Sequence, residues 1–378
     1  MGRARDLADR VLHNRTHEDT DGGRESILTF KGEQSGGEIS TLAQIQASHD
    51  GTADDEKSDL IFKTNDGSDG ASPTERVRID SNGSILTATL GTDNVHLGEG
   101  AGVSIASGGA NNVTVGKNAG TAITTGKKAT LIGAEAGEAL VDGDNNVAIG
   151  YQALTSDTNG EKSVAVGTLA LTAQNQSSLT DTHNTAVGHS AGSAVTTGIK
   201  NTLIGSLAGD ALTDADSNVA VGYQALSFDQ QGSNSVAIGN QALTTQRFTS
   251  GTNAYNVAVG AQAGQEITTG DKNTVVGSLA GDALTTGMNN TVVGYSALGS
   301  NTASGAHVAI GYQALETMNS ASNTSQFNVA VGTQAGKSVT TGTYNTFLGP
   351  QAGFNMTTGS KNTHVGQFDG NNLSLITL

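Results

Sequence analysis

The sequence lacks cysteine, holds few basic residues and has no long apolar run. Without cysteine, the chain has neither disulfide bonds nor thiolate metal sites. No run of about eighteen apolar residues occurs, so we expect no membrane-spanning helix. Hydrophobic residues form only 35% of the chain, which argues against a single conventional core built from the whole length.

Basic residues are outnumbered, with 19 Lys and Arg against 35 Asp and Glu and a net charge of −16. This balance argues against nucleic acid as a partner. The charge is also uneven, since 27 of the first 90 residues are charged against 27 of the remaining 288. We therefore expect a boundary between two parts of the chain near residue 90.

Glycine is abundant, with 52 residues, and it marks an internal repeat. The string Asn-Val-Ala-Ile-Gly at 146–150 has relatives at spacings of 17, 17, 17 and 21 residues, a unit of 72. Such repetition predicts an all-β solenoid in which each coil stacks on the next. With an earlier string that ends at Gly98, there are about sixteen coils. The other strings end at the corner glycines Gly116, Gly133, Gly150, Gly167, Gly188, Gly205, Gly222, Gly239, Gly260, Gly277, Gly294, Gly311, Gly332, Gly349 and Gly366.

The positions around the corner glycines behave as a short strand requires. The residue before each glycine is Val, Ile or Leu, and the residue two places before that one is Val or Thr. These two positions share one face of a strand, and β-branched residues suit a pleated surface. The residue between them is mostly Ala, Leu or Val, so we expect both faces to be covered. Ala stands three places after the glycine in fourteen of fifteen coils, which lets two walls approach closely.

A second pattern groups the coils in fours. The fourth residue after the glycine reads Gly, Gly, Leu, Leu, and the Gly coils carry a bulky residue three places later, such as Ile123 or Leu140. This compensation predicts real interior packing. Asn, which opens eleven of the fifteen coils, is expected to form a ladder between coils and to accept a turn conformation.

The first ninety residues read differently. Alternating apolar residues predict strands at 27–30, 60–63 and 76–80, separated by turn sequences such as Asn-Asp-Gly at 65–67. Before them, residues 5–14 predict a short helix. Its apolar side would consist of Leu7, Val11 and Leu12, and we take these as candidates for docking to a larger assembly; a frayed tail is the alternative.

The predicted organisation therefore has four segments. They are an arm at 1–22, a small β-rich domain at 23–92, the β-solenoid at 93–370 and an apolar tail or cap at 371–378.

Two parts of the chain resemble known families. Leu60–Gly67 and Glu75–Gly83 resemble a module common in tail fibre and other virion proteins of marine, cyanophage-like bacteriophages. The coils resemble those fibres too, and the string Ser235–Gly239 resembles the head β-roll of trimeric autotransporter adhesins. The resemblance implies a homotrimeric fibre without enzymatic activity, located in a virion and docked to other virion proteins through its N-terminal region.

The alternative from the second family is a bacterial surface adhesin. Such a protein should carry a secretory signal and a membrane-anchor barrel, and the sequence shows neither. A self-cleaving C-terminal domain, frequent in phage fibres, is not visible either. Host-surface glycan or protein is the expected external partner in both cases.

The candidate contact sites are the 21-residue coils, whose extra residues fall in loops 172–183, 244–255 and 316–327. Aromatic rings among polar residues suit sugar recognition, and packing over the coil edge is the competing interpretation. We assign no catalytic, cofactor or metal residue; a glycan-cleaving spike would need two placed carboxylates in a cleft. The candidate loop residues are His183, Arg247, Phe248, Tyr255 and Phe327.

Overall fold

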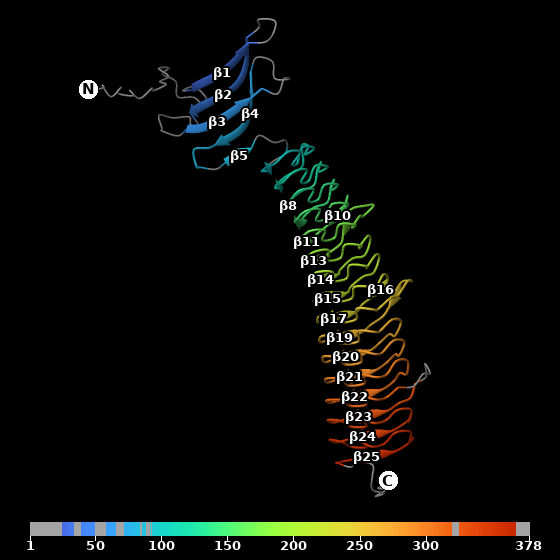
Figure 1. Cartoon of the computed structure of the whole chain (residues 1–378). Helices are drawn as coiled ribbons and strands as arrows, with labels where there is room; N and C mark the ends of the chain where they lie inside the picture. The colour runs from blue at the N-terminus through green and yellow to red at the C-terminus, as the bar shows by residue number, and fades with distance from the viewer. Residues whose placement is uncertain are drawn as a thin grey trace, which may run out of the picture. The chain divides into compact units, whose positions relative to one another are not determined.

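The computed structural model describes residues 25–33, 39–49, 58–65, 72–83, 85–87, 91, 93–319 and 325–367. All elements among these residues are β-strands (Figure 1). Two compact units divide the chain, Met1–Leu90 and Gly91–Leu378. The all-β class, the solenoid of about sixteen coils and the small N-terminal sheet are confirmed. The helix expected at 5–14 and the tail at 371–378 lie outside the described residues.

The first unit is a five-stranded antiparallel sheet in which neighbours in sequence are neighbours in space. Irregularities between Phe30 and Lys31 and between Phe62 and Lys63 shift the register there. Such bulges increase the local twist of a sheet. The strands are β1 (Ser26–Glu33), β2 (Ile39–His49), β3 (Ser58–Thr64), β4 (Thr74–Ile79) and β5 (Ile85–Thr87).

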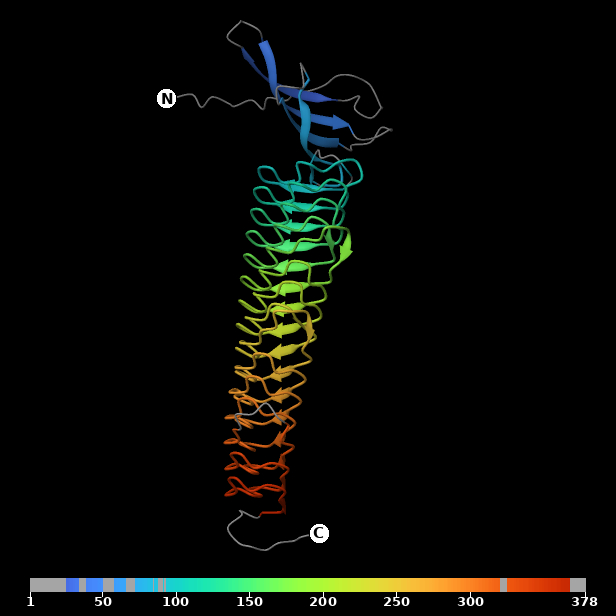
Figure 2. The ribbon, with the colours of Figure 1, turned by 90° about the vertical axis from the view of Figure 1, so that its right-hand side faces the viewer.

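The second unit stacks sixteen three-residue strands into one parallel sheet (Figure 2). Equivalent residues of successive coils lie directly above one another, as Ala148, Ala165 and Ala186 do. The strands are β6 (Val95–Leu97), β7 (Val113–Val115), β8 (Thr130–Ile132), β9 (Val147–Ile149), β11 (Val164–Val166), β13 (Thr185–Val187), β14 (Thr202–Ile204), β15 (Val219–Val221), β17 (Val236–Ile238), β19 (Val257–Val259), β20 (Thr274–Val276), β21 (Thr291–Val293), β22 (Val308–Ile310), β23 (Val329–Val331), β24 (Thr346–Leu348) and β25 (Thr363–Val365).

Four shorter strands belong to the enlarged coils. They form two parallel pairs, and Figure 1 shows β10 and β16 on the side of the coil away from the sixteen-stranded sheet. The pairs are β10 (Gly160–Glu161) with β12 (Thr180–Asp181), and β16 (Gly232–Ser233) with β18 (Thr252–Asn253).

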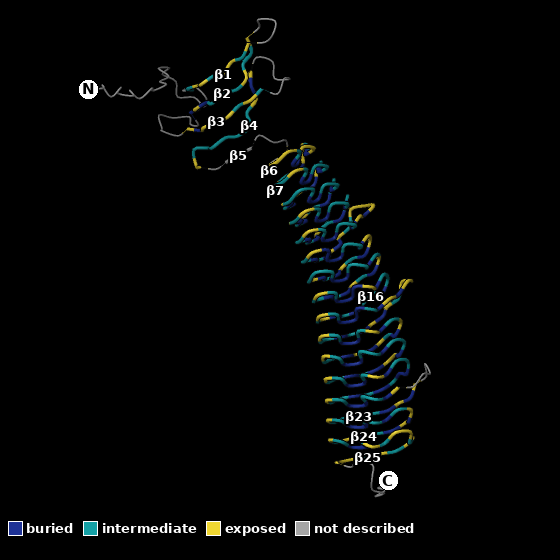
Figure 3. The backbone as a smooth tube through the Cα atoms, in the orientation of Figure 1, coloured by how far each residue is buried: buried dark blue, intermediate teal, exposed yellow. Residues whose placement is uncertain are grey.

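The core is a continuous apolar column inside the coils, visible as the buried inner turns of Figure 3. The middle residue of each three-residue strand from β7 to β24 is buried inside the coil, and so is the Ala three places after the corner glycine. Leu203, in the second coil of its block, fills the space beside Gly192 and Gly209. A Cβ atom at either glycine would lie 2.6–2.7 Å from a Leu203 methyl carbon. In coils with Gly at the fourth position, a large apolar side chain from another part of the coil or from a neighbouring coil therefore fills the space that Leu fills in the other coils.

The corner glycines are required by conformation and by space. Gly188 has φ +141°, and a Cβ atom there would lie 2.5 Å from the carbonyl oxygen of Gly205 in the next coil. No side chain fits this stacking of one corner on another.

The Asn ladder is confirmed, but it joins side chain to backbone. Asn201 Oδ1 accepts the backbone N–H of Asn218 at 3.0 Å, and its Nδ2 donates to the carbonyl of Ala215 at 2.8 Å. The expected turn conformation was wrong for the Asn itself. It belongs to the preceding residue, as at Lys200 with φ +61°, because the ladder Asn must keep its side chain inside the coil.

Candidate functional site

The outward side of the sixteen-stranded sheet is its most unusual surface. Here "outer face" means the first and third residues of β6 to β9, β11, β13 to β15, β17 and β19 to β25. All are Val, Ile, Leu or Thr, and none carries a charge. Ile149, Ile204 and Ile238 are each more than one third exposed. We expect cover on both faces; among the described residues of the solenoid only the inner face is covered, because the coil closes on that side alone.

The dimensions of the outer face matter. Sixteen strands about 4.8 Å apart give a length of about 70 Å, and three residues give a width of about 10 Å, so on the order of 700 Å². Soluble monomers seldom expose more apolar surface than a few hundred Å² in one patch. Each partner in a stable protein interface buries about 800 Å². The outer face thus has the size of an interface.

Tyrosines stand beside this face, one residue after the corner glycine. Tyr151, Tyr223, Tyr295 and Tyr312 are each about half exposed. Tyr295 and Tyr312 stack, with ring centroids 5.8 Å apart and planes 12° from parallel. Stacking covers one face of each ring. This geometry supports a packing role for the pair.

The predicted loop residues His183, Tyr255 and Phe327 occupy one corner of the coil. All three have left-handed φ angles of 50–52° and are about half exposed. They are separated by four coils each, about 19 Å, so they do not form one pocket. Phe327 stacks on Tyr344 with centroids 5.4 Å apart. His183 lies 3.8 Å from the carboxylate of Asp181.

The middle enlarged loop divides its candidates between two environments. Arg247 and Tyr255 are exposed, whereas Phe248 is buried to 8% exposure. Phe248 packs over Gly232, where an added Cβ atom would come within 2.8 Å of its ring. Phe248 therefore holds the loop on the coil and is not available to a ligand.

A buried polar cluster that the sequence did not reveal anchors this loop. Asp229 Oδ1 accepts the backbone N–H groups of Gly232 and Phe248, and its Oδ2 accepts Gln246 Nε2. Gln246 also donates to Ser235 Oγ at 3.1 Å and accepts Asn256 Nδ2 at 2.9 Å. Burial raises the pKa of Asp229. We call Asp229, Ser235, Gln246 and Asn256 the anchor cluster.

The first block repeats the anchor cluster 72 residues earlier, with Asp157, Ser163, Gln174 and Asn184 in the same roles. The third block replaces three members together, by Asn301, His307 and Met318. Asn301 Oδ1 then accepts the N–H of Ser304, whose hydroxyl lies 3.0 Å from His307 Nε2. In the sequence, the cluster is indicated by three residues that recur together at the 72-residue spacing in two blocks and are replaced together in the third.

His307 is fully buried, and the other ring nitrogen, Nδ1, has no hydrogen-bond partner among the described residues. Burial lowers its pKa to about 4. It stands in the column that Asn occupies in most coils. The imidazole is therefore a neutral packing group.

Two half-buried carboxylates, those of Asp142 and Asp216, bind groups of the turns. Asp142 Oδ1 accepts the hydroxyls of Thr124 and Thr125 in the preceding coil, which lowers its pKa. Asp216 Oδ1 accepts the N–H of Ile199 at 2.8 Å. No group of three His, Asp or Glu residues in the described part of the chain could hold a metal ion. A helix long and apolar enough to cross a membrane is likewise absent from the described residues.

The predicted docking residues Leu7, Val11 and Leu12 lie outside the described residues. Comparison with known proteins found no matching family model, no matching curated protein and no matching solved structure.

Proposed function

We propose that the chain is the subunit of a structural fibre, most simply a homotrimer, in which copies lie side by side along the outer face. The observation that carries this proposal is the length of that face, sixteen strands without one charged residue. A net charge of −16 opposes association elsewhere on the surface. The uncharged face is where copies can meet without repulsion.

The repetition supports a spacer role. Each coil is hydrogen-bonded to the next through the sheet and the Asn ladder, so the solenoid is a continuous rod of about 70 Å. Half-exposed rings project from one corner at four-coil intervals, as at Tyr255. In a fibre, these rings interrupt an otherwise regular surface and can contact a host surface.

The fibre is proposed to belong to a virion, specifically a phage tail. The resemblance of Leu60–Gly67 and Glu75–Gly83 to phage virion modules supports this location, with other virion proteins bound through the N-terminal region. Immunogold electron microscopy would test it. Antibody against the chain is expected to label purified particles, and labelling of bacterial cell surfaces alone would favour the adhesin alternative.

The mass of the full chain in solution tests the assembly. Light scattering is expected to give three times 38.0 kDa. Ile204→Asp places a charge on the outer face and should lower the mass. Thr197→Asp adds the same charge to an exposed turn of the preceding coil and should leave it unchanged. A 38.0 kDa species in the unmodified protein would refute the proposal.

A further inference from the structure

The N-terminal sheet exposes large apolar side chains on one face and buries polar side chains on the other, whereas most half-buried sheets do the reverse. Cross-strand pairing places Leu28, Ile45 and Phe62 in one row. Leu28, Phe30, Leu60 and Phe62 are 37–46% exposed, while Asp59, Gln46 and Ile61 on the other face are only 3% exposed. We call the first surface the apolar sheet face. Its members are Leu28, Phe30, Ala43, Ile45, Ala47, Leu60, Phe62, Val77 and Ile79.

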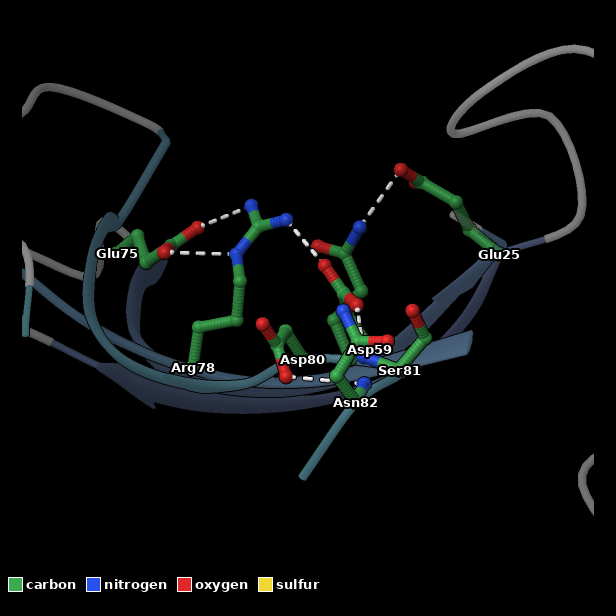
Figure 4. Close-up of polar contacts among 8 residues, drawn as sticks. Glu25, Asp59, Glu75, Arg78, Asp80, Ser81 and Asn82 are labelled. Atoms are coloured by element: carbon green, nitrogen blue, oxygen red, sulfur yellow. Dashed lines mark hydrogen bonds and ion pairs between the residues drawn. The ribbon is translucent and has the colours of Figure 1, made fainter. Parts of the chain in front are cut away.

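On the opposite face several charged and polar side chains pair within the chain (Figure 4), although Gln46 Oε1 has no hydrogen-bond partner among the described residues. Arg78 donates to both oxygens of Glu75, at 3.0 and 2.7 Å, and also to Asp59. Gln46 donates to Glu25 at 2.6 Å. Arg78 holds the pKa of Glu75 below its usual value. Ile27 and Leu42 on this face are 41% and 53% exposed, but its central residues Asp59, Gln46 and Ile61 are covered. The apolar sheet face has no such covered centre around Leu60 and Phe62.

An exposed face of this kind calls for a covering layer. A sheet with one solvated side normally puts its polar residues on that side. Here the side with Phe30 and Phe62 is the open one, and rings of that size dominate interface energies when they are buried. None of the nine residues is charged. Lys31 and Glu33 pair with Thr41 and Ile39 beyond the register shift, at one end of this face. They carry opposite charges, so two copies of the face can meet without net repulsion.

We propose that the apolar sheet face packs against the same face of other copies of this chain. This inference rests on the proposed fibre, in which the copies run in the same direction. Only seven residues separate Thr87 from Val95, at most about 28 Å of chain. Parallel solenoids therefore keep the sheets of all copies at one end, and tethering of this length corresponds to an effective concentration in the millimolar range, by order of magnitude. In such a fibre, the same face of a neighbouring copy is the apolar surface present at the highest local concentration.

The absence of cysteine gives a direct test with the full chain. Ala43 and Gln44 are neighbours in β2 on opposite faces, so Ala43→Cys and Gln44→Cys are matched variants. Oxidation, or a short bis-maleimide reagent, should join copies of Ala43→Cys or Ala47→Cys into dimers on a non-reducing gel. Gln44→Cys should stay uncrosslinked, because a disulfide needs Cα atoms within about 7 Å.

A second pair of variants separates this inference from the proposed fibre. Thr202→Cys and Ile204→Cys report contact along the outer face. Crosslinking there without crosslinking at residues 43 and 47 would overturn the sheet contact and leave the fibre standing. Crosslinking at none of the four positions would overturn both, and equal crosslinking of Ala43→Cys and Gln44→Cys would overturn the choice of face.

Discussion

The carboxylate of Asp229 accepts a hydrogen bond at 2.9 Å from the backbone N–H of Phe248, nineteen residues further along the chain. Asp229 thus fixes the enlarged loop of the following coil by a hydrogen bond from the preceding coil. Gln246, buried beside it, uses its side chain to bind both the carboxylate and the ladder residue Asn256. The loop that presents Tyr255 is therefore positioned by a carboxylate one coil away.

Removing the negative charge should destabilise this coil. In Asp229→Asn an amide group would face the donor of Gln246, and one buried donor would lose its partner, at a cost of about 1–3 kcal/mol. Urea denaturation followed by circular dichroism would measure it. Asp214→Asn is the control, since Asp214 is exposed and its loss should change stability by less than about 0.5 kcal/mol. Equal effects would contradict the anchoring role.

The third block predicts how the anchor cluster can be exchanged. Gln246→Met alone leaves a carboxylate oxygen of buried Asp229 without its donor, which should also be destabilising. The double variant Asp229→Asn/Gln246→Met recreates the pair Asn301 and Met318. We expect a favourable coupling of about 1 kcal/mol or more in a double-mutant cycle, and additive single effects would contradict it.

Buried His307 should make stability depend on pH. Its pKa falls from 6.5 to about 4 on folding, so the unfolded chain binds more protons between these values. Stability is then complete above about pH 6.5 and is lost as pH falls toward 4, by about 2 kcal/mol between pH 7 and pH 5. Denaturation at both pH values would measure this loss.

His307→Asn supplies the comparison, because Asn is the usual residue of this column. The variant should lose that part of the pH dependence. Burial also lowers the pKa of His96 and of His364, so the unmodified protein carries further contributions of the same sign. The difference between the variant and the unmodified protein isolates His307. Parallel stability curves would contradict the prediction.

Much of the solenoid could be predicted because its determinants recur at fixed spacing. The corner glycines and the Val-x-Ile strings each appear once per coil. Fifteen copies at regular spacing exclude a chance pattern. The exposure of the outer face could not be predicted in this way. Ile204 and Leu203 are both apolar and adjacent, and only the closure of the coil decides that Leu203 lies inside.

The enlarged loops show a second limit. Their place followed from the extra four residues, but the opposite environments of Phe248 and Tyr255 did not. Those environments depend on Asp229, which lies in the preceding coil and is one of many acidic residues in turns. Long-range contacts of this kind leave no local pattern in one copy of the motif.

Corner stacking predicts a strong effect of one methyl group. Gly188→Ala would place Cβ 2.5 Å from the Gly205 carbonyl and force φ +141° on an L residue. We expect a loss of about 3 kcal/mol or more. Gly251→Ala is the control, because no atom lies within 4 Å of its Cβ position. Thermal melting would compare them, and similar melting temperatures would contradict the corner geometry.

Variants of Phe248 and Tyr255 distinguish a packing role from a surface-contact role in the middle enlarged loop. Phe248 is 8% exposed and Tyr255 is 52% exposed. Phe248→Ala should cost about 3 kcal/mol because it empties a filled site beside the anchor cluster. Tyr255→Ala should change the denaturation midpoint much less, since Tyr255 is already half exposed. If the fibre contacts a host through this corner, Tyr255→Ala should reduce binding of labelled protein to host cells at unchanged stability. Unchanged binding would remove Tyr255 from the contact surface, and a large loss of stability would assign it to packing.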